Sequence, residues 1–208
     1  KNHQLSLHNE VFKQNQKTKQ LPIKLAQAAH ANAEEFFEEV GKTFKTDCKA
    51  GCSYCCHQPA TVFPFEAIQI AQILKASYSN DKLELLMDKM KARVAEFKQP
   101  SVQKNINNKS ACPLLVNNQC SIYADRPLTC RLAHSFSVKQ CRLSFEKDRR
   151  KIKIPIALEL LTSVSGIIEA EFKQVPVEKL DGHLYELNSA VLAALADGLP
   201  RHVSQLSR

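Results

Sequence analysis

The eight cysteines are the residues of this 208-residue sequence best suited to chemistry, and they fall into two groups. The first group packs four cysteines into nine positions, and residues 57–111 between the groups contain none. The groups are Cys48, Cys52, Cys55 and Cys56, followed by Cys112, Cys120, Cys130 and Cys141. Secreted disulfide scaffolds usually spread their cysteines through a small domain that lacks a core, whereas this chain is long enough to bury one. The clustering therefore predicts metal ligation rather than disulfide pairing.

The spacing of the first group, C-x3-C-x2-C-C, suits thiolates that converge on a metal. Gly51 lies just before the second cysteine and allows a tight turn. Cys55 and Cys56 are adjacent, and adjacent side chains diverge by half a turn in a strand and by about 100° in a helix. Such a pair is unsuited to one tetrahedral ion, so the spacing favours a multinuclear cluster or two neighbouring sites over a single zinc finger.

Basic and imidazole side chains near the second group are the candidates for supporting roles. Four thiolates on one zinc ion, or on a four-iron cluster, leave a net negative charge that a nearby cation should offset. Arg126 and Arg131 flank Cys130 and can supply it, with ordinary surface positions as the alternative. His57 and His134 are the best non-cysteine ligand candidates, although a structural role is favoured for both. His30 lies on a predicted helix far from the motifs in sequence and receives no functional assignment.

The combined pattern resembles the YkgJ-type cysteine-cluster proteins, described as a zinc- or iron-chelating domain. The resemblance covers residues 48–135 and rests on the first cysteine motif, Glu66 and Ile70, Cys112-Pro113-Leu114-Leu115, Cys120-Ser121-Ile122-Tyr123, and Arg126-Pro127 before Cys130-Arg131. The family commonly has Gly where this chain has Asn117-Asn118-Gln119, and Asn accepts the same turn conformations. The resemblance implies a metal or iron–sulfur site. With the spacing, it makes seven cysteines the expected ligands: Cys48, Cys52, Cys55, Cys56, Cys112, Cys120 and Cys130.

Two S-adenosylmethionine-dependent activities are weaker alternatives. The flagellin lysine N-methylase is similar in its cysteine motif, which implies protein lysine methylation as a lesser possibility, but no residues here mark a site for that cofactor. Cys48, Cys52 and Cys55 also match the three-cysteine signature of radical S-adenosylmethionine enzymes. Those enzymes place the signature in a barrel of strands and helices, and this sequence shows no series of strands.

A zinc-stabilised module that binds nucleic acid or a protein partner is the alternative from a different class. Its support is the net charge of +8 and the basic residues of the stretch 139–153. These are Lys139, Arg142, Lys147, Arg149, Arg150, Lys151 and Lys153. Glu146 and Asp148 interrupt the run, which favours a solvated helix end. Trp is absent and aromatic residues make up only 7%, which disfavours a stacking platform for single strands.

Helical periodicity predicts the elements that must position the cysteines. Apolar residues recur every three or four positions in 22–44, 64–77, 81–97, 155–172 and 180–197. Pro22 and Pro64 suit first helical turns, and Gly198 and Pro200 suit the end of the last helix. No sustained apolar–polar alternation predicts a strand. We therefore expect an all-α fold in which the cysteine segments are the irregular parts between helices.

One domain is expected from the length and the absence of internal repeats. Residues 1–20 are polar and predicted to be loosely held, and residues 21–208 form a single helical metal-binding domain with a cysteine core at 48–141. Residues 99–110 are polar and contain Pro100, so they are predicted to be an exposed connection. The sequence starts at Lys1 rather than Met, so we expect that a segment preceded it.

These observations predict a cytoplasmic, helical protein that holds an iron–sulfur cluster, [4Fe-4S], or else zinc, between its two cysteine segments. No apolar run approaches the length of a membrane span. Electron transfer, metal handling and the modification of an unidentified protein partner or substrate are all compatible with such a centre, whether or not the protein is itself an enzyme. The sequence also leaves open whether Cys141 is a ligand.

Overall fold

The computed structural model describes residues 20–41, 45–49, 51–97, 105–155 and 183–196. Outside these residues lie 1–19 of the predicted loose segment 1–20, 156–172 of the helix predicted for 155–172, and Gly198 and Pro200 at the predicted end of the last helix. The described chain is mostly helical. None of its helices is both long enough and apolar enough to cross a membrane.

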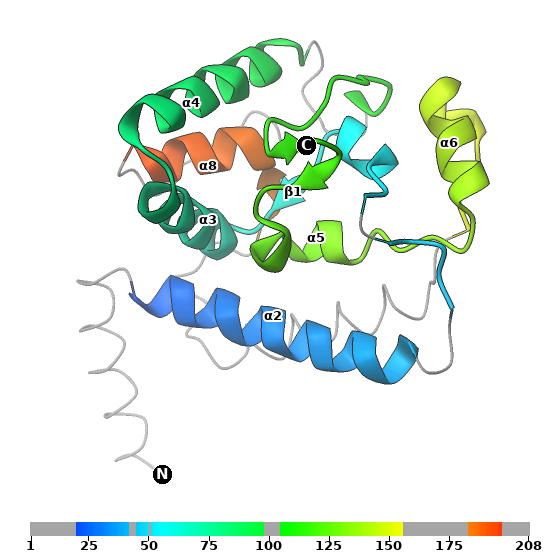
Figure 1. Ribbon diagram of the computed structural model, residues 1–208, viewed down its shortest axis with the longest axis horizontal. Coiled ribbons are helices and arrows are strands. Elements are labelled where there is room, and N and C mark those ends of the chain that lie inside the picture. The colour runs from blue at the N-terminus through cyan, green and yellow to red at the C-terminus, as the bar shows by residue number, and fades with distance from the viewer. Residues whose placement is uncertain (1–19, 42–44, 50, 98–104, 156–182, 197–208) are drawn as a thin grey trace.

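Four helices make up the main body of the described chain, and they lie close to the predicted segments. They are α2 (Gln20–Gly41), α3 (Pro64–Ser77), α4 (Asn80–Ala95) and α8 (Leu187–Leu195). Helix α3 packs against α8 on one side and α2 on the other, and α4 packs against α8 (Figure 1). The first three match their predictions closely, whereas α8 begins seven residues later than the predicted start at residue 180.

Helix α3 is the central helix, and its sequence explains both its start and its burial. Pro64 occupies the first turn, where its missing N–H costs nothing, and the Glu66 carboxylate accepts a hydrogen bond from the Phe63 backbone N–H at 3.1 Å. Apolar residues lie on most sides of the helix, and Phe65, Ile70 and Leu74 are almost completely buried. It therefore forms the wall between α2 and α8.

Two short antiparallel sheets correct the strict all-α prediction. β1 (Thr61–Val62) pairs with β4 (Tyr185–Glu186), with Thr61 opposite Glu186 and Val62 opposite Tyr185. β2 (Leu115–Val116) pairs with β3 (Gln119–Cys120). Each strand has only two residues, too few to display a period of two, so the sequence pattern had no way of showing them.

Asn117 and Asn118, which were expected to accept a turn conformation, form the turn of the β2–β3 hairpin. Asn117 and Asn118 have φ angles of 51° and 60°, which is the left-handed conformation that a two-residue type I′ turn requires at both central positions. Asparagine tolerates this conformation better than most residues. The hairpin therefore places Cys120 opposite Leu115.

In the part of the chain that the structure describes, the buried apolar side chains form two clusters. The larger lies among α3, α4 and α8, where Leu74, Met90 and Val191 have no exposed surface. Cys112 and Cys120 pack against its edge. The smaller joins one face of α2 to Phe63, Phe65 and Leu128. The helices thus provide a firm base on which the cysteine segments rest.

The cysteine segments are irregular, as predicted, and contain only short helical pieces. These are the 3-10 turns η1 (Tyr54–His57), η3 (Tyr123–Asp125) and η4 (Arg149–Lys151) and the helices α5 (Leu128–Arg131) and α6 (Val138–Glu146). Helix α6 stands at the edge of the molecule and packs against η1 and η4 (Figure 1).

The described part of the predicted exposed connection, residues 105–110, is not exposed. Asn105 is buried, and Asn107 and Asn108 are half-buried. The side chain of Asn107 accepts a hydrogen bond from the Arg149 N–H at 2.8 Å and donates one to Asp148 at 2.7 Å. A run of asparagines is polar in sequence, but here the amides bond to the protein itself, which explains why the prediction was wrong.

Candidate metal centre

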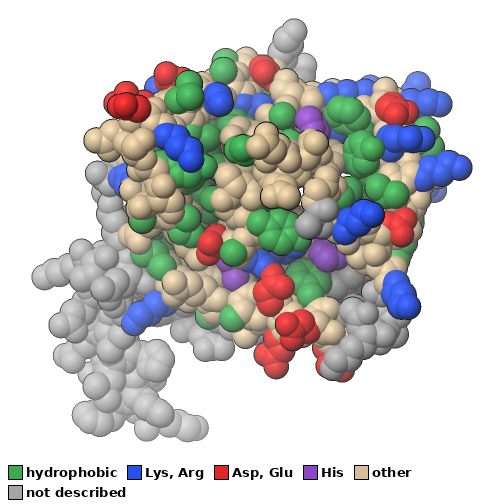
Figure 2. All heavy atoms as spheres, in the orientation of Figure 1, with side chains coloured by type: hydrophobic (Ala, Val, Ile, Leu, Met, Phe, Trp, Pro, Cys, Tyr) green, Lys and Arg blue, Asp and Glu red, His purple; other side chains and the backbone are tan. Residues whose placement is uncertain are grey.

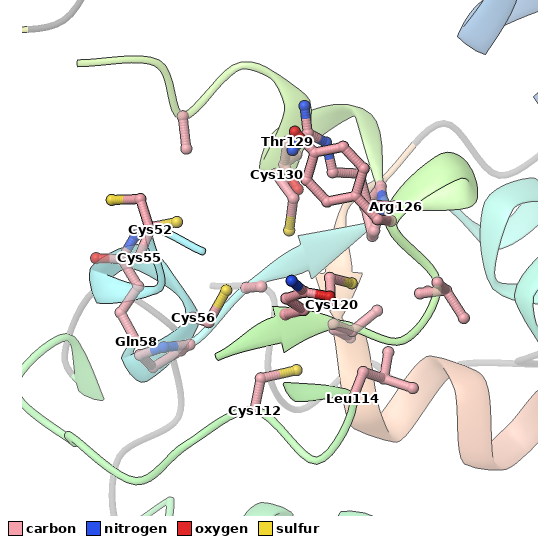
Figure 3. A pocket seen from close by; sticks show the side chains of 18 of the residues that line it. Cys52, Cys55, Cys56, Gln58, Cys112, Leu114, Cys120, Arg126, Thr129 and Cys130 are labelled. Atoms are coloured by element: carbon pink, nitrogen blue, oxygen red, sulfur yellow. The ribbon is translucent and has the colours of Figure 1, made fainter. Parts of the chain in front are cut away.

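Six of the eight cysteines line one cavity of about 490 Å³ between the two cysteine segments (Figure 3). They are Cys52, Cys55, Cys56, Cys112, Cys120 and Cys130. Apolar side chains, including Leu114, Ile122 and Leu187, complete much of the wall. Cys48 and Cys141 are not part of this lining. All eight cysteines are free thiols.

The first cysteine group is shaped by a turn and a short helix. Gly51 has a φ of 85°, in the region that favours glycine, which agrees with the tight turn expected there. The Cys52 N–H donates to the Lys49 carbonyl at 3.0 Å, and the Cys56 N–H donates to the Ser53 carbonyl at 2.9 Å. These bonds close the loop that brings Cys52, Cys55 and Cys56 to the cavity.

The second group approaches the same cavity from other directions. In Figure 3 the sulfur atoms of Cys56, Cys112, Cys120 and Cys130 surround a common space, with Cys52 and Cys55 at one side. The Cys112 N–H donates to the Cys56 carbonyl at 2.8 Å, which ties the two segments together directly. Cys120 comes from the hairpin and Cys130 from α5.

The adjacent thiols Cys55 and Cys56 do not share the same electrostatic character. A hydrogen bond from Cys56 lowers the pKa of Cys55, and the positive charges of Arg126 and Arg149 act in the same direction. The same bond, together with burial, raises the pKa of Cys56. Cys55 is therefore the thiol of this pair that ionises first.

Burial raises the pKa of the other cavity thiols. It raises the pKa of Cys112 to about 11, and it raises the pKa of Cys52, Cys120 and Cys130 as well. A buried thiolate without a compensating charge is unfavourable, so these groups keep their protons at neutral pH in the metal-free protein. Metal binding must therefore release protons.

The sulfur atoms surround a volume rather than a point. Among the described residues, no three His, Cys, Asp or Glu side chains are close enough together to hold a metal ion as they stand. Four thiolates on one zinc ion at about 2.3 Å would lie only about 3.8 Å from one another. The thiols are of the right type and number to bind a metal, but their sulfur atoms lie farther apart than the ligands of a single zinc ion would.

The two arginines that flank Cys130 in sequence have different positions. Arg126 lines the cavity, with its guanidinium carbon 4.1 Å from the centre of the Tyr123 ring. Its Nε atom is buried and has no hydrogen-bond partner among the described residues. Arg131 is also buried, but it donates to the Arg126 carbonyl at 3.0 Å and to the Ala124 carbonyl, and it pairs with Glu34. Arg131 therefore holds backbone carbonyls in place, and of these two arginines only Arg126 lines the cavity.

Neither histidine candidate lines the cavity. The His57 ring lies 4.9 Å from the Phe145 ring, and its Nδ1 atom is 3.3 Å from the Lys109 carbonyl oxygen. His134 stacks on Phe37 with 4.9 Å between ring centres. Burial lowers the pKa of His134, which keeps its ring neutral. Both contacts agree with the structural role that was favoured for these residues.

Glu66 connects the helices to the cysteine segments, and His30 is its partner. The fully buried carboxylate accepts hydrogen bonds from the backbone N–H groups of Phe63 at 3.1 Å and Leu128 at 2.7 Å, and its Oε1 atom lies 2.9 Å from His30 Nε2. His30 is thus linked to the cysteine region, although its sequence position is distant. Leu128 opens α5, which carries Cys130, so Glu66 positions the start of that helix.

Two residues that sequence reasoning did not assign to the site contribute to it. Cys141 lies on α6, close enough for its charge to affect the thiols of Cys48 and Cys52. Arg149 donates to the carbonyls of Tyr54 and His57, and nothing in the sequence distinguishes it from its basic neighbours.

The three arginines of the basic stretch 139–153 interact with other residues of the chain, and its four lysines are exposed. Arg150 pairs with Asp148 at 2.9 Å, Arg142 lies 3.6 Å from Glu146, and Arg149 is buried. Figure 2 shows acidic side chains among the basic ones on the side where Figure 1 places α6. The acidic residues that interrupt the run in the sequence therefore also pair with its basic side chains in the structure.

A comparison with protein families matches residues 47–152 to the model "CxxCxxCC: Putative zinc- or iron-chelating domain". The match includes all eight cysteines and extends beyond residue 135, the end of the resemblance noted in the sequence, to Cys141 and Arg149. The first spacing in this chain is C-x3-C, one residue longer than the name implies. No significant match to a curated protein or to a solved structure was found. Because the match spans just over half of the 208 residues, the chain belongs to the CxxCxxCC family.

Proposed function

We propose that this protein binds an iron–sulfur cluster in the cavity between its two cysteine segments and serves a redox role or supports a modification reaction. The observation that carries the proposal is the convergence of six free thiols from both segments on one cavity of about 490 Å³. Free thiols in this number persist in a reducing compartment, which supports a cytoplasmic location.

The spread of the thiols favours a cluster over a single zinc ion. Thiolates bound to the separate iron atoms of a cluster stand farther apart than thiolates bound to one ion, and no three potential ligands in the described chain form a compact ion site. Adjacent Cys55 and Cys56 also suit separate metal atoms, because their side chains diverge. Zinc remains the alternative metal.

Cys56, Cys112, Cys120 and Cys130 are the best-placed ligands, because their sulfur atoms surround the common space (Figure 3). Cys52 and Cys55 border the same cavity, and Cys48 adjoins them. When bound, the cluster would supply one-electron transfer or an iron position open to a ligand. Arg126 offsets the negative charge of the thiolates, and the apolar wall limits water access and so influences the reduction potential.

Anaerobic purification followed by iron, zinc and acid-labile sulfide analysis tests the proposal. We expect brown protein that contains iron and sulfide in similar amounts. Stoichiometric zinc without sulfide in anaerobically prepared protein would show that the cluster proposal is wrong. Protein purified in air is unsuitable for this test, because a cluster sensitive to oxygen can be lost and replaced by zinc.

A further inference from the structure

Arg149 reaches both ends of the turn that carries the adjacent cysteines. Its Nη2 atom donates hydrogen bonds to the carbonyl of Tyr54 at 3.3 Å and to the carbonyl of His57 at 3.1 Å. These are the first and last residues of η1, and Cys55 and Cys56 lie between them. One guanidinium therefore spans the turn behind the thiol pair.

Hydrogen bonds from outside the turn add to the few that its own backbone makes. A 3-10 helix of four residues has poor hydrogen-bond geometry, and no side chain caps the N-terminus of η1. The Cys56 N–H to Ser53 carbonyl bond is internal to the turn, and the Cys112 N–H bonds to the Cys56 carbonyl from outside it. Arg149 adds hydrogen bonds to the carbonyls at both ends, and so supports the turn with a side chain from a distant part of the chain.

Arg149 is itself held firmly in place. Its backbone N–H donates to Asn107 at 2.8 Å, and its guanidinium carbon lies 5.7 Å from the centre of the Phe145 ring. Phe145 in turn contacts Tyr54 and His57. Arg149 is only 7% exposed, so its side chain is fixed by the residues packed around it rather than free to move at the surface. A side chain held in advance positions its partners at a low entropic cost.

We propose that Arg149 is the positioning residue of the metal centre, holding η1 in the conformation that presents Cys55 and Cys56 to separate metal atoms. This inference rests on the proposed function. Both bonds come from one Nη2 atom, whose two N–H groups have directions fixed by the plane of the guanidinium, whereas a lysine ammonium at this position keeps the charge without that fixed geometry. The substitution Arg149→Lys therefore separates the effect of hydrogen-bond geometry from the effect of positive charge.

Arg150 is a matched control. It is the next residue, it is exposed, and its guanidinium bonds to Asp148 rather than to the cysteine turn. The experiment compares wild-type protein with Arg149→Lys, Arg149→Gln and Arg150→Gln after anaerobic reconstitution with Fe²⁺ and sulfide. The readouts are bound iron and sulfide, the electron paramagnetic resonance spectrum of the reduced protein, and the rate of iron release to a chelator. Circular dichroism of each metal-free variant measures folding separately.

We expect both Arg149 variants to release iron about 10–100-fold faster than the wild type, the usual effect of losing an outer-shell partner, and to show an altered resonance spectrum. Arg150→Gln should behave as the wild type. A wild-type spectrum and release rate in Arg149→Lys would overturn the proposal, because charge alone would then suffice. The same holds if folded Arg149→Gln resembles Arg150→Gln. If Arg149→Gln does not fold, the lysine variant decides.

Failure of the proposed function gives a different result. In that case the wild-type protein itself takes up no iron and sulfide, whatever the variants do. The comparison is then repeated with Zn²⁺, using the rate of zinc release to the chelator. Faster release from both Arg149 variants than from Arg150→Gln would support the positioning role without a cluster, and equal release would overturn it.

Discussion

The helical base and the cysteine region are stabilised by different interactions. In the base, α3, α4 and α8 bury apolar side chains such as Leu74, Met90 and Val191 completely. The cysteine region has short turns, and its buried apolar side chains, such as Leu114 and Ile122, join the core of the helices instead of forming a separate one. Partly buried thiols line the cavity between its segments. Apolar burial is complete without a ligand, whereas thiols gathered around a cavity gain most of their stabilisation from a metal.

Buried arginines hold the irregular backbone of the cysteine region in place. Arg131 holds the segment before Cys130 through the carbonyls of Ala124 and Arg126. Arg149 holds the ends of η1, and Arg93 on α4 bonds to Asn108 in the segment that leads to Cys112. Each one satisfies backbone or amide groups that lie outside regular structure. These bonds give the cysteine region a defined backbone that does not depend on regular helices or sheets.

The largest expected effect comes from removing a thiol of either group. Cys52→Ser and Cys130→Ser should each strip the metal and destabilise the whole domain. A structural metal contributes about 10–16 kcal/mol of apparent free energy, and domains are stable by only about 5–15 kcal/mol. Metal analysis and circular dichroism measure both effects. Full metal and helix content in Cys130→Ser, with loss of both in Cys52→Ser, would break the model of one shared centre.

A substitution in the helical base should reduce stability without changing the metal. Leu74→Ala removes a fully buried side chain and should lower the free energy of unfolding by about 2–5 kcal/mol. The metal bound per folded molecule should stay the same. Leu85 on α4 is 58% exposed, so Leu85→Ala is the control and should change stability by less than about 0.5 kcal/mol. Loss of metal from folded Leu74→Ala would show that the two regions are not separable.

Glu66 tests the connection between the regions. Glu66→Gln keeps the shape but weakens the hydrogen bonds from Phe63 and Leu128, so we expect a loss of about 1–3 kcal/mol in unfolding free energy. Metal release should also accelerate, because Leu128 opens the helix that carries Cys130. Chemical denaturation and chelator kinetics measure the two effects. Exposed Glu84 on α4 provides the control Glu84→Gln, and equal metal release in both variants would contradict a link through Glu66.

The stability of the metal-free protein should fall as the pH rises. Burial raises the pKa of Cys112 to about 11 and also raises that of Cys130, above the value of about 8.5 in an unfolded chain. The stabilisation is complete below pH 8.5 and is lost as the pH rises toward the folded pKa, because the unfolded thiols ionise first. Between pH 7.5 and 9.5 we expect a loss of about 1 kcal/mol for each such thiol.

Denaturation of metal-free and metal-loaded protein at the two pH values measures this effect. The loaded protein is the control, because thiolates bound to metal have already lost their protons and should show no such decrease. Metal-free protein that is equally stable at both pH values would indicate that these thiols are solvated rather than buried.

The smallest effect is expected for Cys141→Ser. Cys141 lies outside the cavity lining, so this variant should retain more metal than Cys52→Ser or Cys130→Ser, with little change in circular dichroism. Metal loss equal to that of Cys130→Ser would place Cys141 in the centre itself. Its position near Cys48 and Cys52 makes the measurement informative about how far the centre extends.

The sequence by itself determined the main helices, the two cysteine groups, the turns at Gly51 and at Asn117–Asn118, and the family. These features depend on local spacing, on residue type and on backbone preference, which a single chain displays directly. Even the structural contacts of His57 and His134 agreed with the more ordinary interpretation.

Only the tertiary structure decided which polar residues serve the site. Arg149 and Arg150 are adjacent and chemically identical, yet one spans the cysteine turn and the other lies in solvent beside Asp148. Arg126 and Arg131 likewise separate into a cavity residue and a backbone clamp. His30 and Glu66 meet across 36 positions, and β1 forms only because it pairs with β4 from a distant part of the chain. Long-range contacts have no local pattern, because they arise when packing brings remote residues together, and so the sequence pattern alone could not reveal them.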